Sequence, residues 1–338
     1  MPRFSLIFIL FFPPFLSFGQ HKPDFMPEDI TADPFGNARC YCIPGIRNKS
    51  AGKGLEISYS QNGSSTYRPE KTPMAAPYSA TNRNEQFLMS IKAPLVNNTD
   101  FKMLVGAKFV RDQYHFKRVG NDYRPLFNQL DQHSLKNTSF DLIMIKPLNE
   151  RHYGVVRLKY GFAGNFRGPF NFDKKNRVIS MMAFFASKKD EDHEWGAGFT
   201  FLQSFRRTII LPVFVWNRNF SDKWGLESIL PLNFFMRYNH TPRRLFLGGI
   251  EYMSQSYRVS FADALQGEQD YALNHSAIIA SISAEQRLAG WLGMFVKVGF
   301  QKNFATDFRS KSTNTATFDA EPTDTPFFRV GLFVTKPK

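Results

Sequence analysis

Apolar and polar residues alternate along most of the chain, as the segment "YGVVRLKYGF" (153–162) illustrates. Because successive side chains of a strand point to opposite faces, Leu158 and Tyr160 share one face while Arg157 and Lys159 share the other. A transmembrane barrel suits both faces, since lipid contacts its outer surface and a polar lumen contacts its inner surface. The pattern therefore predicts a strand in the wall of such a barrel.

The same two-residue period recurs in twelve further segments, several of which reach the roughly 9–11 residues that a tilted strand needs to cross a bilayer. These segments are 54–60, 86–96, 101–109, 138–148, 178–187, 195–205, 208–216, 224–238, 244–259, 275–286, 291–301 and 326–335. Because single-chain bacterial barrels have an even number of strands, the thirteen segments predict an all-β fold, a single antiparallel transmembrane barrel of 12–14 strands over residues 54–338. Of the thirteen segments, residues 224–238 fit a single strand least well, because Pro231 lies in their middle.

Polar stretches rich in Asn, Asp, Ser and Gly separate these segments and are predicted to be loops. The long ones are 61–84, 110–137, 164–177, 260–274 and 302–325. A soluble β-sandwich also shows alternating side chains, but its strands need not be so long. Four tryptophans lie beside turns rather than in strand centres, as the aromatic girdle of a membrane barrel requires. They are Trp195, Trp216, Trp224 and Trp291.

The first 19 residues read as a cleavable signal peptide. Arg3 precedes the apolar run "FSLIFILFFPPFLSF", and Ser17 and Gly19 are the small residues of a cleavage site. The run contains two prolines and is shorter than the roughly 20 residues that a membrane helix needs. Residues 20–53 are expected to be irregular, and Cys40 and Cys42 are expected to be either a small disulfide or two free thiols. The predicted destination is the outer membrane.

Composition narrows the range of functions. Aromatic residues make up 16% of the 338 residues, and the formal net charge is +14. No spacing typical of a nucleic-acid-binding motif accompanies this charge, so no nucleic-acid partner is expected. His275 and Ser276 are adjacent in a predicted strand and therefore point to opposite faces. We accordingly expect no enzyme, no metal site and no cofactor.

Cations are the most informative candidate site, because they fall on the less apolar face of their strands. The candidates for lining the lumen are Lys92, Lys102, Lys108, Arg157, Lys159, Lys297 and Arg329. Acidic residues also occur within strands, namely Glu56, Asp141, Glu227, Glu251 and Glu285. Two arrangements remain open. The charges pair across a filled barrel, or the cations line a passage that favours anions.

At this point the chain resembles a Gram-negative outer-membrane β-barrel of an uncharacterised family, a domain of unknown function. The resemblance covers about residues 50–338 and rests on "LSFGQ", "KAPLVNNTDFKMLVGAKF", "WGLESILPLNFFMRY" and the closing strand "PFFRVGLFVT". It implies location and architecture rather than an activity.

The leading functional hypothesis is a passive channel or transporter for small anionic solutes. The alternative is a plugged structural or interaction barrel whose long loops 110–137 and 302–325 bind partners. The third is a lipid-modifying barrel enzyme. The expected contacts are outer-membrane lipid and small anionic solutes, while the sequence does not identify a protein partner.

Overall fold

One large β-sheet dominates the structure. The computed structural model describes residues 44–50, 52–69, 77–120, 123–205, 207–263, 267–310 and 316–335, so the predicted signal peptide, Cys40 and Cys42 lie outside the described residues. In the described part of the chain, sixteen strands join one sheet. The elements are β1 (Leu55–Asn62), β2 (Ser65–Pro69), β3 (Ser79–Asn97), β4 (Lys102–Val119), α1 (Arg124–Gln132), β5 (Leu135–Pro147), β6 (His152–Gly164), η1 (Lys174–Asn176), β7 (Arg177–Asp190), β8 (His193–Ser204), β9 (Arg207–Asn219), β10 (Trp224–Leu230), β11 (Asn233–Thr241), β12 (Arg244–Asp263), β13 (Gly267–Arg287), β14 (Leu292–Ser310), β15 (Ala316–Pro322) and β16 (Thr325–Val334).

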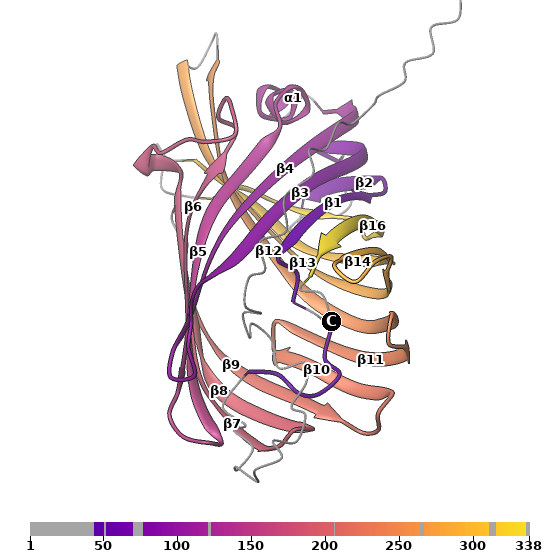
Figure 1. Ribbon diagram of the computed structural model, residues 1–338. Coiled ribbons are helices and arrows are strands. Elements are labelled where there is room, and N and C mark those ends of the chain that lie inside the picture. The colour runs from indigo at the N-terminus through magenta and orange to yellow at the C-terminus, as the bar shows by residue number, and fades with distance from the viewer. Residues whose placement is uncertain are drawn as a thin grey trace, which may run out of the picture.

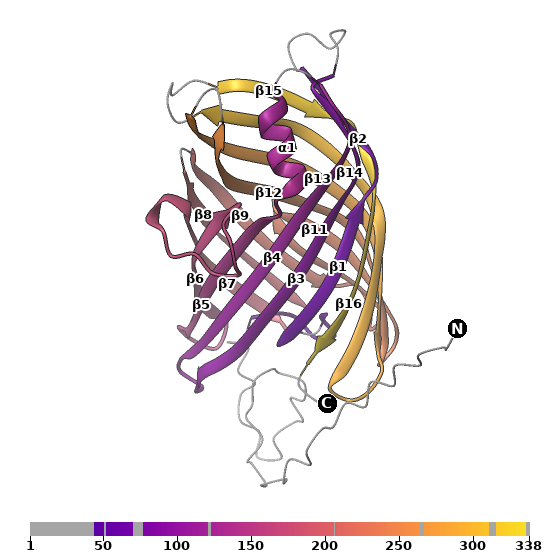
Figure 2. The same ribbon diagram turned by 90° about the horizontal axis from the view of Figure 1, so that it is seen from above.

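The sheet closes into a barrel because its first and last strands pair antiparallel (Figures 1 and 2). The β1–β16 ladder runs from Leu55↔Val334 to Asn62↔Phe327, and β2 continues the same register against β15 at Tyr67↔Pro322. Thus β1 and β2 form one interrupted strand, and β15 and β16 form another. The sixteen strands of the described chain therefore occupy fourteen positions around the barrel, which confirms the predicted fold and its range of 12–14 strands.

The segment 224–238 is not one strand, so this part of the prediction was wrong. The position of Pro231 in the middle of the segment had indicated this possibility. β10 ends at Leu230 and β11 begins at Asn233, with Pro231 and Leu232 in the turn between them. Proline has no N–H with which to continue a ladder. With β10 and β11 counted as two strands, the connections between strands alternate between the two ends of the barrel, also after residue 244.

The predicted long loops are largely wrong as well, because strand structure continues through most of them. β4 runs to Val119 and is followed by α1, so residues 110–137 are not a loop. Residues 302–325 contain the end of β14 and all of β15. Backbone pairing persists in these polar stretches because ladder hydrogen bonds need no apolar alternation. The alternation marks only the part of each strand that borders lipid.

The two ends of the barrel differ. The turn end holds the start of β1, the end of β16 and short connections such as 98–101 and 148–151. The loop end holds α1, η1 and the upper halves of the longest strands, β12 and β13. Bacterial outer-membrane barrels place short turns on the periplasmic side and long loops outside, so the loop end corresponds to the cell exterior.

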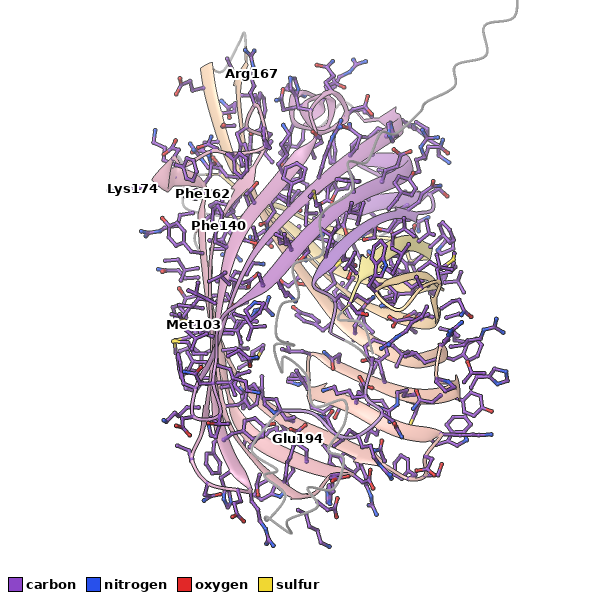
Figure 3. The ribbon with its side chains drawn as sticks, viewed as in Figure 1. Met103, Phe140, Phe162, Arg167, Lys174 and Glu194 are labelled. Carbon is purple, nitrogen blue, oxygen red and sulfur yellow. The ribbon has the colours of Figure 1, made fainter. Side chains whose placement is uncertain are left out.

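Large apolar side chains cover the outer face of the barrel, as a lipid-facing surface requires. Ile282 and Ile210 are 65% and 66% exposed, and Leu158 and Tyr160 lie outward on β6 as the alternation predicts. Figure 3 shows Met103 and Phe140 pointing away from the wall, whereas Glu194 points inward. The described helices include none that is long and apolar enough to cross a membrane.

The barrel narrows toward the loop end, because β12 leans across to β6. Arg258 of β12 forms a parallel bridge with Gly164 of β6, and the Asn165 side chain bonds both the backbone N–H and the carbonyl of Ser260. A Cβ atom on Gly164 would lie 2.6 Å from the Arg258 carbonyl oxygen, so glycine permits this close approach. Because β6 and β12 meet here, β7–β11 do not belong to the wall of the upper barrel; these strands end below the contact between β6 and β12.

Candidate functional site

The strand registers place the seven predicted lumen cations on the inward face. On β4, Lys102 and Lys108 have the parity of the buried Val110 and Asp112, and on β16 Arg329 has that of the buried Phe327. Lys102 lies near the turn end of its strand, apart from the middle of the wall. The remaining inward cations are Lys92 on β3, Arg157 and Lys159 on β6, and Lys297 on β14.

The acidic residues named from the sequence lie beside cations. Arg157 binds Asp141 at 2.8 Å, Lys297 binds Glu251 at 2.8 Å, and Arg237 binds Glu227 at 2.9 Å. Lys53, just before β1, lies 3.0 Å from Glu285 and 3.7 Å from Glu56. These pairs join strands that lie side by side or one strand apart, so they neutralise charge along the wall of the lumen rather than across it.

Three lysines do not follow this pattern. Among the described residues, no acidic group lies within ion-pair distance of Lys92, Lys108 or Lys159. All three lysines are half-buried on the inward face of the wall. Lys108 lies within electrostatic reach of Lys159, Arg329 and Arg157. We call Lys92, Lys108, Arg157, Lys159 and Arg329 the cationic wall.

An apolar cap closes the loop end above the cationic wall. Helix α1 follows β4 and turns its Leu126, Phe127 and Leu130 side chains into the barrel mouth, where each is almost fully buried. Phe127 meets the Phe308 ring at a centroid distance of 6.0 Å and the Phe116 ring at 5.5 Å. Pro125 stands at the start of the helix, where its missing N–H costs nothing. We call α1 and the apolar cluster around it the cap.

Polar side chains from opposite walls meet just below the cap. The Tyr257 hydroxyl of β12 donates to the buried Asp112 carboxylate of β4, and Gln86 Nε2 donates to the same carboxylate at 2.7 Å. Because β12 and β4 lie on different sides of the barrel, this contact spans the lumen.

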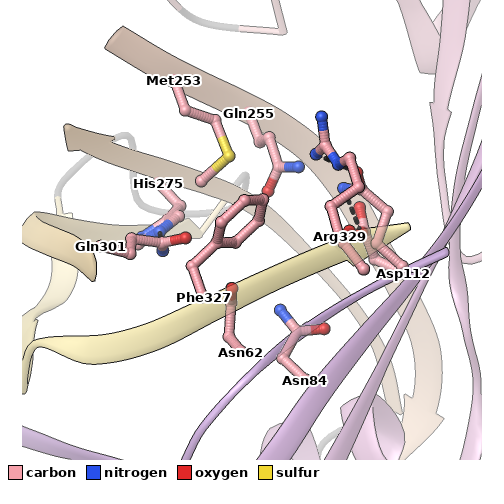
Figure 4. Close-up of a pocket in the computed structure, with 11 residues that line it drawn as sticks. Asn62, Asn84, Asp112, Met253, Gln255, His275, Gln301, Phe327 and Arg329 are labelled. Atoms are coloured by element: carbon pink, nitrogen blue, oxygen red, sulfur yellow. Dashed lines mark hydrogen bonds between the residues drawn. The ribbon is translucent and has the colours of Figure 1, made fainter. Parts of the chain in front are cut away.

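A small cavity of about 20 Å³ lies beneath that contact (Figure 4). Four buried polar atoms that lack a hydrogen-bond partner among the described residues belong to its lining. They are Asn62 Oδ1, Asn84 Oδ1, Gln301 Oε1 and Arg329 Nε. A polar cavity of this size has room for about one water molecule. The lumen below the cap is therefore suited to polar, hydrated contents rather than to a dry core.

A short segment, residues 44–50, lies inside the barrel at the turn end, where Figure 1 shows it as an indigo trace near β10 and β11. Gly45 N–H donates to Glu194 Oε1 at 2.8 Å, and Ser50 donates from its N–H and hydroxyl to Glu227 at 2.9 and 2.6 Å. Arg47 pairs with Asp192 at 3.1 Å, and the hydrogen bond that Arg47 donates to this carboxylate raises the pKa of Arg47 above its ordinary value. We call residues 44–50 the inner segment.

The remaining candidates from the sequence have simple positions. The four tryptophans all lie at the turn end with exposed rings, and Trp195 faces Trp216 across the β8–β9 ladder. His275 points inward to Thr306 Oγ1 at 2.8 Å, whereas the Ser276 hydroxyl accepts from Tyr252 at 3.1 Å. The expectation that these two point to opposite faces is confirmed. In the described part of the chain, no three His, Cys, Asp or Glu side chains are arranged to hold a metal ion.

Sequence patterns missed several parts of the site. Glu194 is 1% exposed and also accepts from Tyr153 and Asn217, yet it precedes Trp195 in a segment that reads as an ordinary strand start. The cap was hidden in a predicted loop, although Leu126, Phe127 and Leu130 follow the i, i+1, i+4 spacing of one helix face. The inner segment carries no periodic signal at all.

Comparisons with known proteins give a family and a set of distant structures. The family described as a domain of unknown function, DUF6268, matches residues 49–335. Among curated proteins, none matches the sequence significantly.

Three solved outer-membrane protein structures are among those that resemble the chain. The outer-membrane channel COG4313 from Pseudomonas putida F1 is 8% identical, with 86% of this chain and 99% of that chain covered and a TM-score of 0.42. A Pseudomonas aeruginosa FadL homologue is 9% identical, covering 83% and 89%, with a TM-score of 0.37. The Escherichia coli outer-membrane protease OmpT is 11% identical, covering 85% and 99%, with a TM-score of 0.29. Because all three scores are below 0.5, no functional argument rests on them.

Proposed function

This chain belongs to the DUF6268 family, and we propose that it is an outer-membrane barrel that passes small anionic solutes and that the cap keeps it closed at rest. The observation that carries the proposal is the cationic wall, in which Lys92, Lys108 and Lys159 face the lumen with no acidic partner among the described residues. Unpaired inward charges are expensive to bury without water or a counter-ion. A wall built this way therefore favours hydrated anions.

The cap supplies the closed state in this proposal. α1 is a nine-residue helix outside the strand ladder. It is held by apolar contacts and by Asp131, whose carboxylate accepts from the Phe116 N–H of β4 and whose carbonyl accepts from Gln113 Nε2, each at 2.8 Å. Displacement of α1 would break these two hydrogen bonds to β4 but none of the hydrogen bonds between neighbouring strands. Movements of loops and lids of this kind control access in many proteins. We infer that displacement of α1 opens the upper barrel.

A plugged interaction barrel is the second candidate function, and two observations favour it. The five acidic strand residues lie beside inward cations, and Tyr257 and Asp112 meet across the lumen. A fully plugged barrel nevertheless leaves the three lysines unexplained, so we favour the gated passage. We propose a non-catalytic protein in either case, with lipid against the apolar outer face.

Charge selectivity tests the proposal. The reversal potential of single channels under a salt gradient would be measured for a variant that lacks α1, with and without Lys108→Gln and Lys159→Gln. Removing two like charges from a partly dehydrated wall should lower the anion-to-cation permeability ratio by about threefold or more.

The control carries Lys146→Gln and Lys189→Gln, two exposed lysines near the turn end. It should leave the ratio unchanged. If the variant that lacks α1 were selective for cations, the proposed role of the cationic wall would be contradicted. The same holds if both pairs of substitutions changed the permeability ratio equally.

A further inference from the structure

A basic cavity of about 300 Å³ lies at the loop end, separate from the cationic wall. Its lining comes from η1, from the ends of β7 and β8, and from the upper parts of β12, β13 and β14. The lining residues that matter here are Lys174, Lys175, Arg177, Arg258, Asp270 and Arg309. We call it the rim cavity.

The rim cavity lies outside the upper barrel. On β12, Arg258 has the opposite parity to Tyr257 and Val259, which are buried in the cap cluster, and on β13 Asp270 has the opposite parity to Tyr271. The outward row of β12 changes from Ile250 to Ser254, Ser256 and Arg258 as the strand rises. A polar row on this face does not suit lipid tails, so this part of the wall borders something polar.

Two of the five cations that line the rim cavity, Arg258 and Arg309, form ion pairs with described acidic groups. Arg258 binds Asp270 through two hydrogen bonds of 2.7 and 2.8 Å, and its guanidinium lies 4.0 Å from Asp173. Arg309 pairs with Asp307 at 2.6 Å. These contacts orient both guanidinium groups, of which Arg258 is largely buried and Arg309 is exposed.

The three other cations lack such partners. Among the described residues, no acidic group lies within ion-pair distance of Lys174, Lys175 or Arg177. The Asp173 carboxylate accepts from the Lys175 N–H at 2.9 Å and so fixes the start of η1, which presents both lysines. The rim cavity therefore contains two arginines that carboxylates hold in place and three further cations that have no described acidic group within ion-pair distance.

The height of the rim cavity points to the membrane surface. Arg177 is the cross-strand partner of Phe162, which lies directly above the exposed Tyr160 on the outward row of β6. The next loop carries Phe170 and Phe172, which are 56% and 69% exposed, and the Phe172 ring packs against Phe162 at 5.4 Å. Figure 3 shows Phe162 and Lys174 near each other at this height of the wall, with Arg167 higher up. Exposed rings beside cations are typical of a protein surface at lipid-headgroup level.

From this arrangement we propose that the rim cavity binds a phosphoryl group, carried either by an outer-leaflet lipid headgroup or by free phosphate. Arginine and lysine donors form charge-assisted hydrogen bonds with phosphate oxygens, and guanidinium groups can do so in pairs. Lys174, Lys175 and Arg177 supply the unmatched charge, and Arg258 and Arg309 supply fixed donors. The site does not depend on the proposed passage, because none of its residues belongs to the cationic wall.

Binding to the full-length protein in detergent tests the proposal with two probes. Diphosphoryl lipid A, its dephosphorylated form and a neutral lipid would be compared by native mass spectrometry, and radiolabelled inorganic phosphate by equilibrium dialysis. The wild type should retain the phosphorylated lipid, the free phosphate, or both, but not the dephosphorylated lipid. Retention of the lipid alone identifies the headgroup as the source, and retention of phosphate alone identifies the free anion.

Matched variants locate the site. The triple change Lys174→Gln, Lys175→Gln and Arg177→Gln should lower occupancy about tenfold, because three charge-assisted contacts are lost. The control triple, Lys146→Gln, Arg151→Gln and Lys189→Gln, removes the same charge from exposed positions near the turn end.

The control should bind within about twofold of wild type, since distant exposed charges are screened. Lys174→Gln with Lys175→Gln is the substitute if the triple does not fold. Loss of binding in both sets, or no retention of either phosphorylated probe by the wild type, would overturn the proposal.

Discussion

At the scale of single residues, the direction of each strand side chain decides what it contacts. β6 carries Leu158 and Tyr160 outward and Arg157 and Lys159 inward, as the alternation in the sequence predicts. Such assignments need no knowledge of the partner strands, because the period of two is a property of the backbone. What alternation does not give is whether an inward charge has a partner. Arg157 has one in Asp141, whereas Lys159, the cross-strand neighbour of the same Asp141, lies beyond ion-pair distance of every described acidic group.

The assignment of faces predicts unequal costs for two neighbouring substitutions. Leu158→Arg should destabilise the barrel by about 2–4 kcal/mol, because it places a cation against the middle of the bilayer. Lys159→Ser should cost far less, since it removes a charge from a cationic wall that faces water. Chemical unfolding of both variants in lipid vesicles measures the difference. Equal costs would contradict the placement of lipid and lumen on opposite faces of β6.

At the scale of elements, the sequence predicts the membrane-spanning half of each strand far better than the rest. Thirteen segments were recognisable because lipid on one side and a polar lumen on the other impose alternation. The last residues of β12 (260–263) and the first of β13 (267–274) border polar surroundings on their outer face, so they lose that signal and were predicted to be a loop. The cap, the inner segment and the approach of β12 to β6 depend on contacts between residues far apart in the chain. Periodicity within a short window does not report such contacts.

The β6–β12 approach predicts that two glycines of one strand differ in tolerance. Gly164→Val should destabilise the protein by about 1–3 kcal/mol, because its Cβ would overlap the Arg258 carbonyl and force the strands apart. Gly154→Val is the matched control, since nothing lies within 4 Å of a Cβ at that position. It should change stability by less than about 0.5 kcal/mol. Unfolding midpoints of the two variants provide the comparison, and a similar loss for both would argue against the narrowing of the upper barrel.

At the scale of the whole molecule, the barrel has a wide part at the turn end and a narrow part at the loop end, which side chains fill. The inner segment lies at the turn end and the cationic wall at mid-height. The cap fills the loop end, where Figure 2 shows α1 across the mouth. In the proposed function, the paired acids are compatible with a closed state and the three lysines outside ion-pair distance give the lumen its preference for anions. A passage for anions therefore requires that the cap move.

Single-channel conductance in a planar bilayer tests that requirement most directly. The wild type would be compared with a variant in which residues 123–133 are replaced by a short Gly-Ser linker, after both are shown to be folded and inserted. The wild type should be closed most of the time, whereas the variant should show frequent, stable conductance steps with anion selectivity. An inserted variant that stays silent, or one that prefers cations, would contradict the account of a capped anion passage.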